Sequence, residues 1–346
     1  MRAIDILKAP LWAASLASGA KSFKDNPLIG SKWLNERGLH EKRLLTAERM
    51  SDFRRSLMRR LVSKEHAEAY RRDGYVIVRD VLPPEAFERL KHEVIDNAFA
   101  AQEMLQGNAV TRFTPITRKM IRELPEFGAL VTGPLFQGLL RYVGSWNADP
   151  ITFIHTVFAE PDRGPRDPQT VFHSDTFQPT SKCWYFLSDV AEDGGPFTYV
   201  PGSHRMTPER LAWEREQALS ASSGARSMHS LGSFRITDEE LATLGYRAPV
   251  KVAVPANTLV VADTHGFHAR GLSLRPTVRL GIYGSLRRNP FAPLPGLDVF
   301  NIPGLRWRQA EIHDAINNWK MRTGRPTGQP GVGEVKLLDP PRTWNR

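Results

Sequence analysis

A histidine and an aspartate two positions apart are the first residues with the chemistry of a site. They are His173 and Asp175, in the stretch TVFHSDTFQPT. On a β-strand, residues two apart face the same side, so both side chains can reach one metal ion. A neutral imidazole with a carboxylate suits Fe(II) or Mn(II). The pair alone is weak evidence, because roughly 0.5 such pairs are expected by chance from this composition.

A second histidine and an arginine stand downstream, in NTLVVADTHGFHARGLSLRPTVRLGIYGS. A facial triad needs one more histidine from another strand, and this stretch offers His265 and His268. On a strand, His265 would face the opposite side. Arg279 follows His268 after a strand end, a turn and a return, and its guanidinium can hold a carboxylate through two parallel hydrogen bonds. These residues together indicate a site for iron and a carboxylate-bearing co-substrate.

Several motifs around these residues carry a family resemblance. They are FHSD, YFLSDVAEDGGPFTYVPGSHR, and GFHARG with Arg279. From about Tyr70, in YRRDGYVIVRDVLPPEAFERL, to about Asn289, the sequence resembles the phytanoyl-CoA dioxygenase family of Fe(II)- and 2-oxoglutarate-dependent oxygenases. The resemblance implies an α+β fold: a double-stranded β-helix, a jelly-roll or cupin-like barrel, flanked by N-terminal helices.

The resemblance also implies roles for the four residues. His173, Asp175 and His268 would bind Fe(II) as the catalytic centre, and Arg279 would bind the distal carboxylate of 2-oxoglutarate. With O2, such an enzyme hydroxylates an aliphatic C–H bond and releases succinate and CO2. Related halogenases replace the ligand carboxylate with a small residue; Asp175 keeps it, which favours hydroxylation.

Five further residues are candidates for contacts in the pocket. Trp184 and Arg270 would line the co-substrate pocket, although a core position is an alternative for the tryptophan. Thr176, Gln178 and His155 would meet the substrate. Two other functions stay open: a barrel of the same fold without turnover, and an isomerase-type cupin that uses its metal as a Lewis acid.

The elements that must position these residues follow from composition. Helical spacing from residue 44 to 61, with arginines between the apolar positions, predicts an amphipathic basic helix. A second helix is expected between a Ser63 cap and Gly74, and a third over residues 83–105. Short runs of β-branched and aromatic residues then predict many strands and a barrel or sandwich, among them QTVFHSD, KCWYFLSDV and VRLGIYGSL.

This order predicts three regions. Residues 1–62 form a basic amphipathic arm, 63–300 the oxygenase domain, and 301–346 a C-terminal extension. The extension would hold a helix near 310–320 and end in a mobile tail rich in Gly and Pro. A polar, helix-leaning insert at about 207–245 interrupts the strands, and a lid over the site is one role open to it.

Charge and composition limit the partners. The net charge is +10, and twelve basic against five acidic residues between Lys21 and Lys64 place most of it in the arm. The arm could contact a membrane surface peripherally, and the substrate would be a small or lipid-like molecule. The body has no basic stripe interleaved with aromatics, so no nucleic acid is expected. One cysteine, Cys183, excludes an intrachain disulfide and favours a reducing, cytoplasmic setting.

Overall fold

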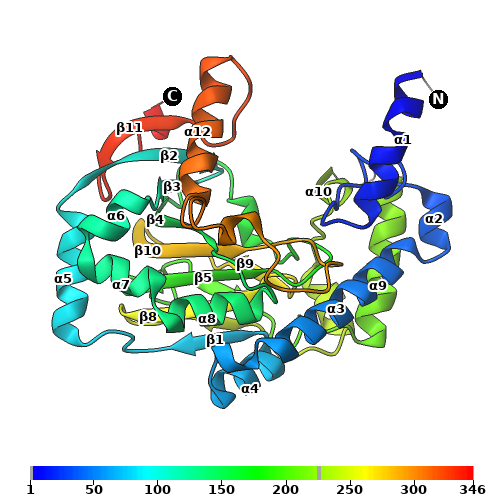
Figure 1. Cartoon of the computed structure of the whole chain (residues 1–346), viewed down its shortest axis with the longest axis horizontal. Helices are drawn as coiled ribbons and strands as arrows, with labels where there is room; N and C mark the ends of the chain where they lie inside the picture. Colours follow the sequence, from blue (N-terminus) through cyan, green and yellow to red (C-terminus); the bar gives the residue numbers. More distant parts are fainter. Residues whose placement is uncertain (1–2, 224–226, 346) are drawn as a thin grey trace.

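Two antiparallel β-sheets form the centre of the molecule, with helices packed outside them (Figure 1). The computed structural model describes residues 3–223 and 227–345. In this part of the chain, the large sheet has eight strands in the order β1-β8-β5-β10-β4-β3-β2-β11, and the small sheet has the order β7-β6-β9. The strands are β1 (Tyr75–Val78), β2 (Ala98–Gln106), β3 (Ala109–Pro115), β4 (Ile151–Ala159), β5 (Ser181–Phe186), β6 (Phe197–Tyr199), β7 (Val250–Val252), β8 (Thr258–Asp263), β9 (His268–Arg270), β10 (Thr277–Leu286) and β11 (Gly331–Lys336).

The two faces of the large sheet have different neighbours. Alternate residues such as Cys183, Tyr185 and Ile282 point to one face and join a hydrophobic core with three helices. Their partners in the alternation, Trp184 and Tyr283, point to the other face and line a cavity shared with the small sheet. The predicted jelly-roll barrel with outer helices is therefore present. The three covering helices are α5 (Pro84–Ile95), α7 (Pro125–Thr132) and α8 (Pro134–Val143).

The N-terminal region is helical, as predicted, and packs against the body. As expected, Ser63 caps one of its helices by accepting a hydrogen bond from the His66 backbone N–H, and Gly74 ends that helix with φ of 87°. The helices of this region are α1 (Ala3–Leu16), α2 (Lys32–Glu36), α3 (Leu39–Leu57), the 3-10 turn η1 (Arg59–Leu61) and α4 (Lys64–Asp73).

Helix α3 turns a different face to the body than predicted. Arg54 and Arg55 are buried, whereas Phe53 and Leu57, expected on the apolar face, are 49% and 54% exposed. The reason is that the Arg54 guanidinium meets backbone carbonyls of the body at 2.7–2.8 Å, which satisfies its buried donors. Arg54 and Arg55 therefore anchor the arm, whereas Arg49 of the same helix remains exposed.

Two predictions at the edge of the large sheet were wrong. The helix expected to reach residue 105 ends at Ile95, and the next residues form β2. The expected mobile tail contains β11, which pairs with β2 and extends the sheet. The buried Arg112 on β3 holds this end in place: it pairs with Glu103 at 2.7 Å and donates to the carbonyl of Leu337. The predicted C-terminal helix is present as α12 (Gln309–Arg322).

The insert at 207–245 is helical, as predicted, but lies away from the main cavity. Its Trp213 packs in a hydrophobic cluster with Phe23 of the N-terminal region and with Phe234. No described insert residue lines the main cavity, and the insert packs between the N-terminal helices and the barrel. The insert contains α9 (Pro208–Ser222), α10 (Ser227–Ser230) and α11 (Asp238–Thr243); α6 (Arg118–Glu123) and the short turns η2 (Pro168–Thr170), η3 (Val299–Asn301) and η4 (Thr343–Asn345) complete the elements.

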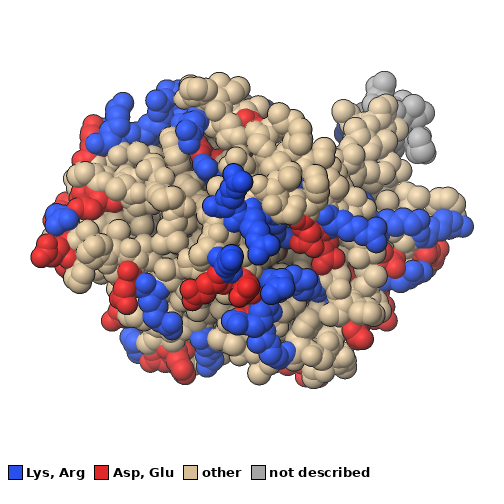
Figure 2. Space-filling view, turned by 60° about the horizontal axis from the view of Figure 1, so that its bottom comes forward, with Lys and Arg blue, Asp and Glu red and all other residues tan. Residues whose placement is uncertain are grey.

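The surface shows mixed charge. On the face drawn in Figure 2, Lys and Arg side chains lie among Asp and Glu, and a group of basic side chains crosses the middle of the face. Among the described residues, no helix combines the length and the apolar character needed to cross a membrane.

Candidate metal centre and its cavity

Backbone pairing brings His173 and His268 together from distant parts of the sequence. Each residue donates its backbone N–H to the carbonyl of the other, with both N···O distances at 3.0 Å. His268 begins β9, whereas His173 sits in an isolated bridge and not in the strand predicted for QTVFHSD. The next residue, Ser174, donates its backbone N–H to the carbonyl of Phe234, so the insert also positions this segment.

The two imidazoles aim the same ring nitrogen at the carboxylate between them. Nδ1 of His173 lies 2.8 Å from the Val171 carbonyl, and Nδ1 of His268 lies 3.0 Å from the Gly266 carbonyl. A carbonyl only accepts, so each Nδ1 carries the proton and each Nε2 keeps a free lone pair. Both Nε2 atoms lie 3.8 Å from an oxygen of Asp175.

The distances of this triad fit one metal ion. A ligand atom from each of His173, Asp175 and His268 lies within 4.8 Å of the other two. Both histidines are buried, and the aspartate side chain is 20% exposed. Two imidazole nitrogens and one carboxylate on one side of an ion form the facial arrangement that leaves the opposite positions open.

Electrostatics keep the triad in the protonation state that a metal ion needs. Burial, and then the neighbouring His268 ring, lowers the pKa of His173 to about 3. Burial also lowers the pKa of His268. Burial opposes ionisation of Asp175, but the Lys182 ammonium and the two imidazoles outweigh it and hold the pKa of this carboxyl well below its usual value. At neutral pH the triad is two neutral imidazoles and one carboxylate.

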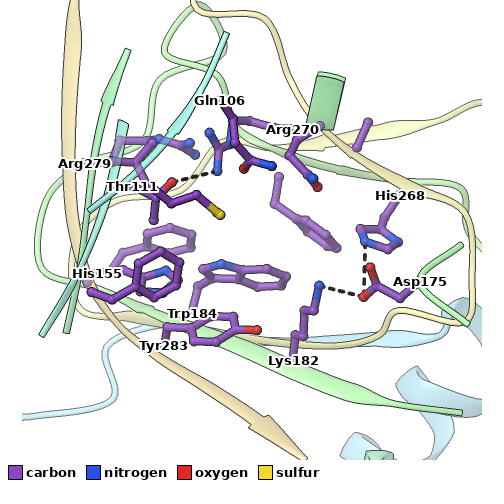
Figure 3. A pocket seen from close by; sticks show the side chains of 18 of the residues that line it. Gln106, Thr111, His155, Asp175, Lys182, Trp184, His268, Arg270, Arg279 and Tyr283 are labelled. Atoms are coloured by element: carbon purple, nitrogen blue, oxygen red, sulfur yellow. Dashed lines mark hydrogen bonds and ion pairs between the residues drawn. The ribbon is translucent and has the colours of Figure 1, made fainter. Parts of the chain in front are cut away.

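A cavity of about 360 Å³ extends from the triad between the two sheets (Figure 3). Arg279 lies at the far end, where its Nε is buried, and it forms no hydrogen bond or ion pair with the described residues. Burial, and then the neighbouring Arg270 guanidinium, lowers the pKa of Arg279 to about 9. A buried cation without a partner is costly, so this end of the cavity is built to receive an anion.

Three other predicted residues also line this cavity. Trp184 lies on its floor, and His155 stacks on Tyr283 with ring centroids 4.2 Å apart and planes 4° apart. Burial lowers the pKa of His155 well below its usual value, so its ring is neutral. Arg270 reaches the cavity too, but its charge is already paired with Asp167 at 2.7 Å.

Two predicted substrate contacts lie elsewhere. Thr176 and Gln178 are buried and do not line the main cavity. The carbonyl of Thr176 instead lies 2.8 Å from Nδ1 of His265. The alternation that places side chains on one face of a strand does not apply here, because the chain after Asp175 runs as loop and not as strand. His265 also lies outside the cavity, as expected for the histidine not chosen as a ligand.

Sequence reasoning missed several residues of the site. Lys182 forms an ion pair of 2.6 Å with Asp175, and Lys21 donates to the Asp175 backbone carbonyl at 2.5 Å. Tyr283 was missed as well. For Lys182 and Tyr283 the signal was available, because each lies an even number of positions from a predicted pocket residue on its own strand. Nothing in the sequence around Lys21 connects it to a site 154 positions away.

The family model described as phytanoyl-CoA dioxygenase matches residues 70–269. No curated protein matches the sequence.

Solved structures give more distant likenesses. HygX from Streptomyces hygroscopicus with nickel, 2-oxoglutarate and hygromycin B bound is 15% identical, with 71% of this chain and 94% of HygX covered and a TM-score of 0.41. EctD from S. alaskensis with bound Fe is 14% identical, with 69% and 82% covered and a TM-score of 0.40. The carbocyclase SnoK from nogalamycin biosynthesis is 23% identical, with 70% and 91% covered and a TM-score of 0.38. At these values the likenesses carry no inference about the reaction or substrate of this chain.

Proposed function

Because this chain belongs to the phytanoyl-CoA dioxygenase family, we propose that it is an Fe(II)- and 2-oxoglutarate-dependent oxygenase that hydroxylates an aliphatic C–H bond. One observation carries the proposal: the triad and the unpaired Arg279 line the same cavity. The first fits a metal ion and the second fits the free carboxylate of a dicarboxylic acid. The substrate is a small or lipid-like molecule.

The residues present fit the metal. His173 and His268 each offer the Nε2 atom of a neutral imidazole, and Asp175 offers an ionised carboxylate. These are the protonation states that binding of a divalent ion requires. Bound Fe(II) would supply the activation of dioxygen. The chain's own share is to hold the ligands: each Nδ1–H is tied to a carbonyl, which fixes the orientation of each ring before metal binds.

The cavity also fits 2-oxoglutarate. Arg279 would hold its distal carboxylate with a bidentate pair, and Trp184 and the neutral His155 would pack along its carbon chain. Arg270, paired with Asp167, would add positive potential without being the main anchor.

The two atoms of O2 enter two different products, succinate and the hydroxylated substrate. 2-Oxoglutarate and O2 give succinate and CO2 with one oxygen atom incorporated into succinate, and the second oxygen atom converts R–H to R–OH. The retained carboxylate of Asp175 supports hydroxylation rather than transfer of a halide. Two alternative functions compete with hydroxylation: a barrel without turnover, and a cupin that uses its metal only as a Lewis acid in an isomerisation.

Oxygen-dependent release of succinate separates these functions. Protein loaded with Fe(II) should convert 2-oxoglutarate to succinate in air and not under nitrogen, even slowly without substrate. Asp175→Ala should abolish this conversion, whereas Arg275→Ala, an exposed arginine paired with Asp193, should not. Succinate release that is equal in the wild type and Asp175→Ala would overturn the proposal.

A further inference from the structure

A second cavity lies directly beside the metal ligands. It has a volume of about 390 Å³ and shares Asp175 and Lys182 with the main cavity, so the two adjoin at the triad. Arg279 lies only in the main cavity, which the co-substrate of the proposed function would enter. The second cavity is therefore free to hold another part of the reacting complex.

Basic side chains line this second cavity. Lys21, Lys182 and Arg287 border it, and Arg235 bridges by its backbone to His173 nearby. Of these, only Lys182 forms an ion pair within the described part of the chain, with Asp175. Lys21 donates to the backbone carbonyl of Asp175, which leaves its charge uncompensated.

The two arginines that line this cavity differ in whether their charge is paired. Arg288 pairs with the buried Asp298, so its charge is already neutralised inside the fold. Its sequence neighbour Arg287 has no such partner among the described residues and points to the cavity. The two unpaired positive charges of Lys21 and Arg287 repel each other, and this cost is offset when an anion binds between them.

We propose that this second cavity binds a phosphate group of the substrate and thereby places the oxidised carbon in the main cavity beside the triad. The inference rests on the proposed function and names its substrate class: a molecule that carries a phosphate ester. The uncompensated charges of Lys21 and Arg287, beside the paired Lys182, match a dianion better than a single carboxylate.

Two of the basic residues of this cavity come from outside the family-matched region. Lys21 belongs to the N-terminal region and Arg287 follows β10, so both lie outside the residues 70–269 that match the family model. Lys182 and Asp175, which also line the cavity, come from the matched region. The N-terminal region is therefore a substrate-recognition element of this enzyme.

Binding of glycerol 3-phosphate tests the proposal. The full chain, with Fe(II) and 2-oxoglutarate under nitrogen, is titrated by calorimetry. Lys21→Ala and Arg287→Ala should each weaken binding by about tenfold or more, as expected for loss of one charge-assisted hydrogen bond. The matched controls are Lys24→Ala, an exposed lysine three positions from Lys21, and Arg322→Ala, an exposed arginine of α12. They should bind as the wild type does.

Each outcome has a defined meaning. Equal affinity in wild type, Lys21→Ala and Arg287→Ala, or no measurable binding to the wild type, would overturn the phosphate site. Succinate release in air by the wild-type preparation would then show that the proposed oxygenase function stands without it. Vesicles of phosphatidylcholine with phosphatidic acid form a second arm: competition with glycerol 3-phosphate would identify a lipid phosphate, and its absence a soluble ester.

Discussion

At the scale of the residue, the charge of Arg279 is the main indication of what the cavity binds. Arg279 has a buried Nε and no ion pair among the described residues, and its pKa is lowered to about 9 by burial and by Arg270. A guanidinium in this condition gains more from an incoming carboxylate than one that is already paired. The co-substrate, rather than the protein, is the expected partner of this charge.

Arg279→Ala should therefore weaken 2-oxoglutarate binding by roughly 10- to 100-fold, the value of a lost charge-assisted pair. Metal binding should change little, because Arg279 lies at the opposite end of the cavity from the triad (Figure 3). Calorimetry of the Fe(II) form under nitrogen measures both. Arg275→Ala on the same stretch is the control. An unchanged affinity for 2-oxoglutarate in Arg279→Ala would contradict its role.

Residue types and spacing located much of this site. The structure brings together His173, Asp175 and His268 and places Arg279 in the same cavity. Thr176 was expected at the substrate but lies outside the main cavity, since the chain after Asp175 is a loop whose side-chain directions follow from tertiary packing. Lys21 had no signal at all, since it reaches the site only through the tertiary packing of the arm.

At the scale of the element, buried charges join the N-terminal helices to the barrel. Arg54 of α3 donates to the carbonyls of Ser145, Pro290 and Ala292. On α9, Glu214 accepts from Arg210 at 2.7 Å and lies 2.9 Å from His40 of α3. Loss of one partner in such a buried group leaves the others without compensation.

Arg54→Ala should lower the free energy of unfolding by roughly 3 kcal/mol, because three carbonyls lose their buried donors. Arg49→Ala, at an exposed position of the same helix, should change it by less than about 0.5 kcal/mol. Urea unfolding followed by circular dichroism gives both values. Equal stability of the two variants would show that the arm is not anchored through Arg54.

Glu214 makes stability depend on acid pH. Burial raises its pKa, but the Arg210 guanidinium and then His40 outweigh burial and lower the pKa to about 2. A carboxyl with a depressed pKa stabilises the fold above its unfolded pKa, and this stabilisation is lost as pH falls toward the folded pKa.

Glu214→Gln should accordingly lower the free energy of unfolding by roughly 3 kcal/mol at pH 7. The difference from wild type should shrink as pH falls from 4.5 toward 2. The exposed Glu216 on the same helix supplies the control variant, Glu216→Gln. Urea titrations across this pH range measure the effect, and a difference that stays constant with pH would count against the ionised Glu214.

The local sequence pattern predicted the ends of one helix correctly but missed two strands. The Ser63 cap and the Gly74 end were correct, because capping depends on one or two side chains and on the local backbone. Strand β2 was taken for the end of a helix, and β11 for a mobile tail. Strand β11 is the edge strand and pairs only with β2, which lies far away in the sequence, so no local window contains this pairing. Strand β2 lies between β11 and β3, and its alanine-rich sequence indicates a helix until these pairings are known.

At the scale of the whole molecule, the sequence pattern of many short strands predicts the barrel. It does not predict which residues from the two ends of the chain line the cavities. The family-matched residues 70–269 supply the triad. Regions outside the match supply Lys21, Arg279, Arg287 and Gln329 to the two cavities. The N-terminal and C-terminal regions, which composition set apart as an arm and a tail, pack on the barrel and complete it (Figure 1).

The central claim is that one cavity holds a metal ion on the triad and 2-oxoglutarate on Arg279. Anaerobic titration of the full chain with Fe(II) and 2-oxoglutarate, followed by visible absorption, tests it most directly. A charge-transfer band should appear only when both are present, and it should be absent in Asp175→Ala, while Arg275→Ala should retain it. Folded wild-type protein that shows no band with both components, or the same band in Asp175→Ala, would contradict the account.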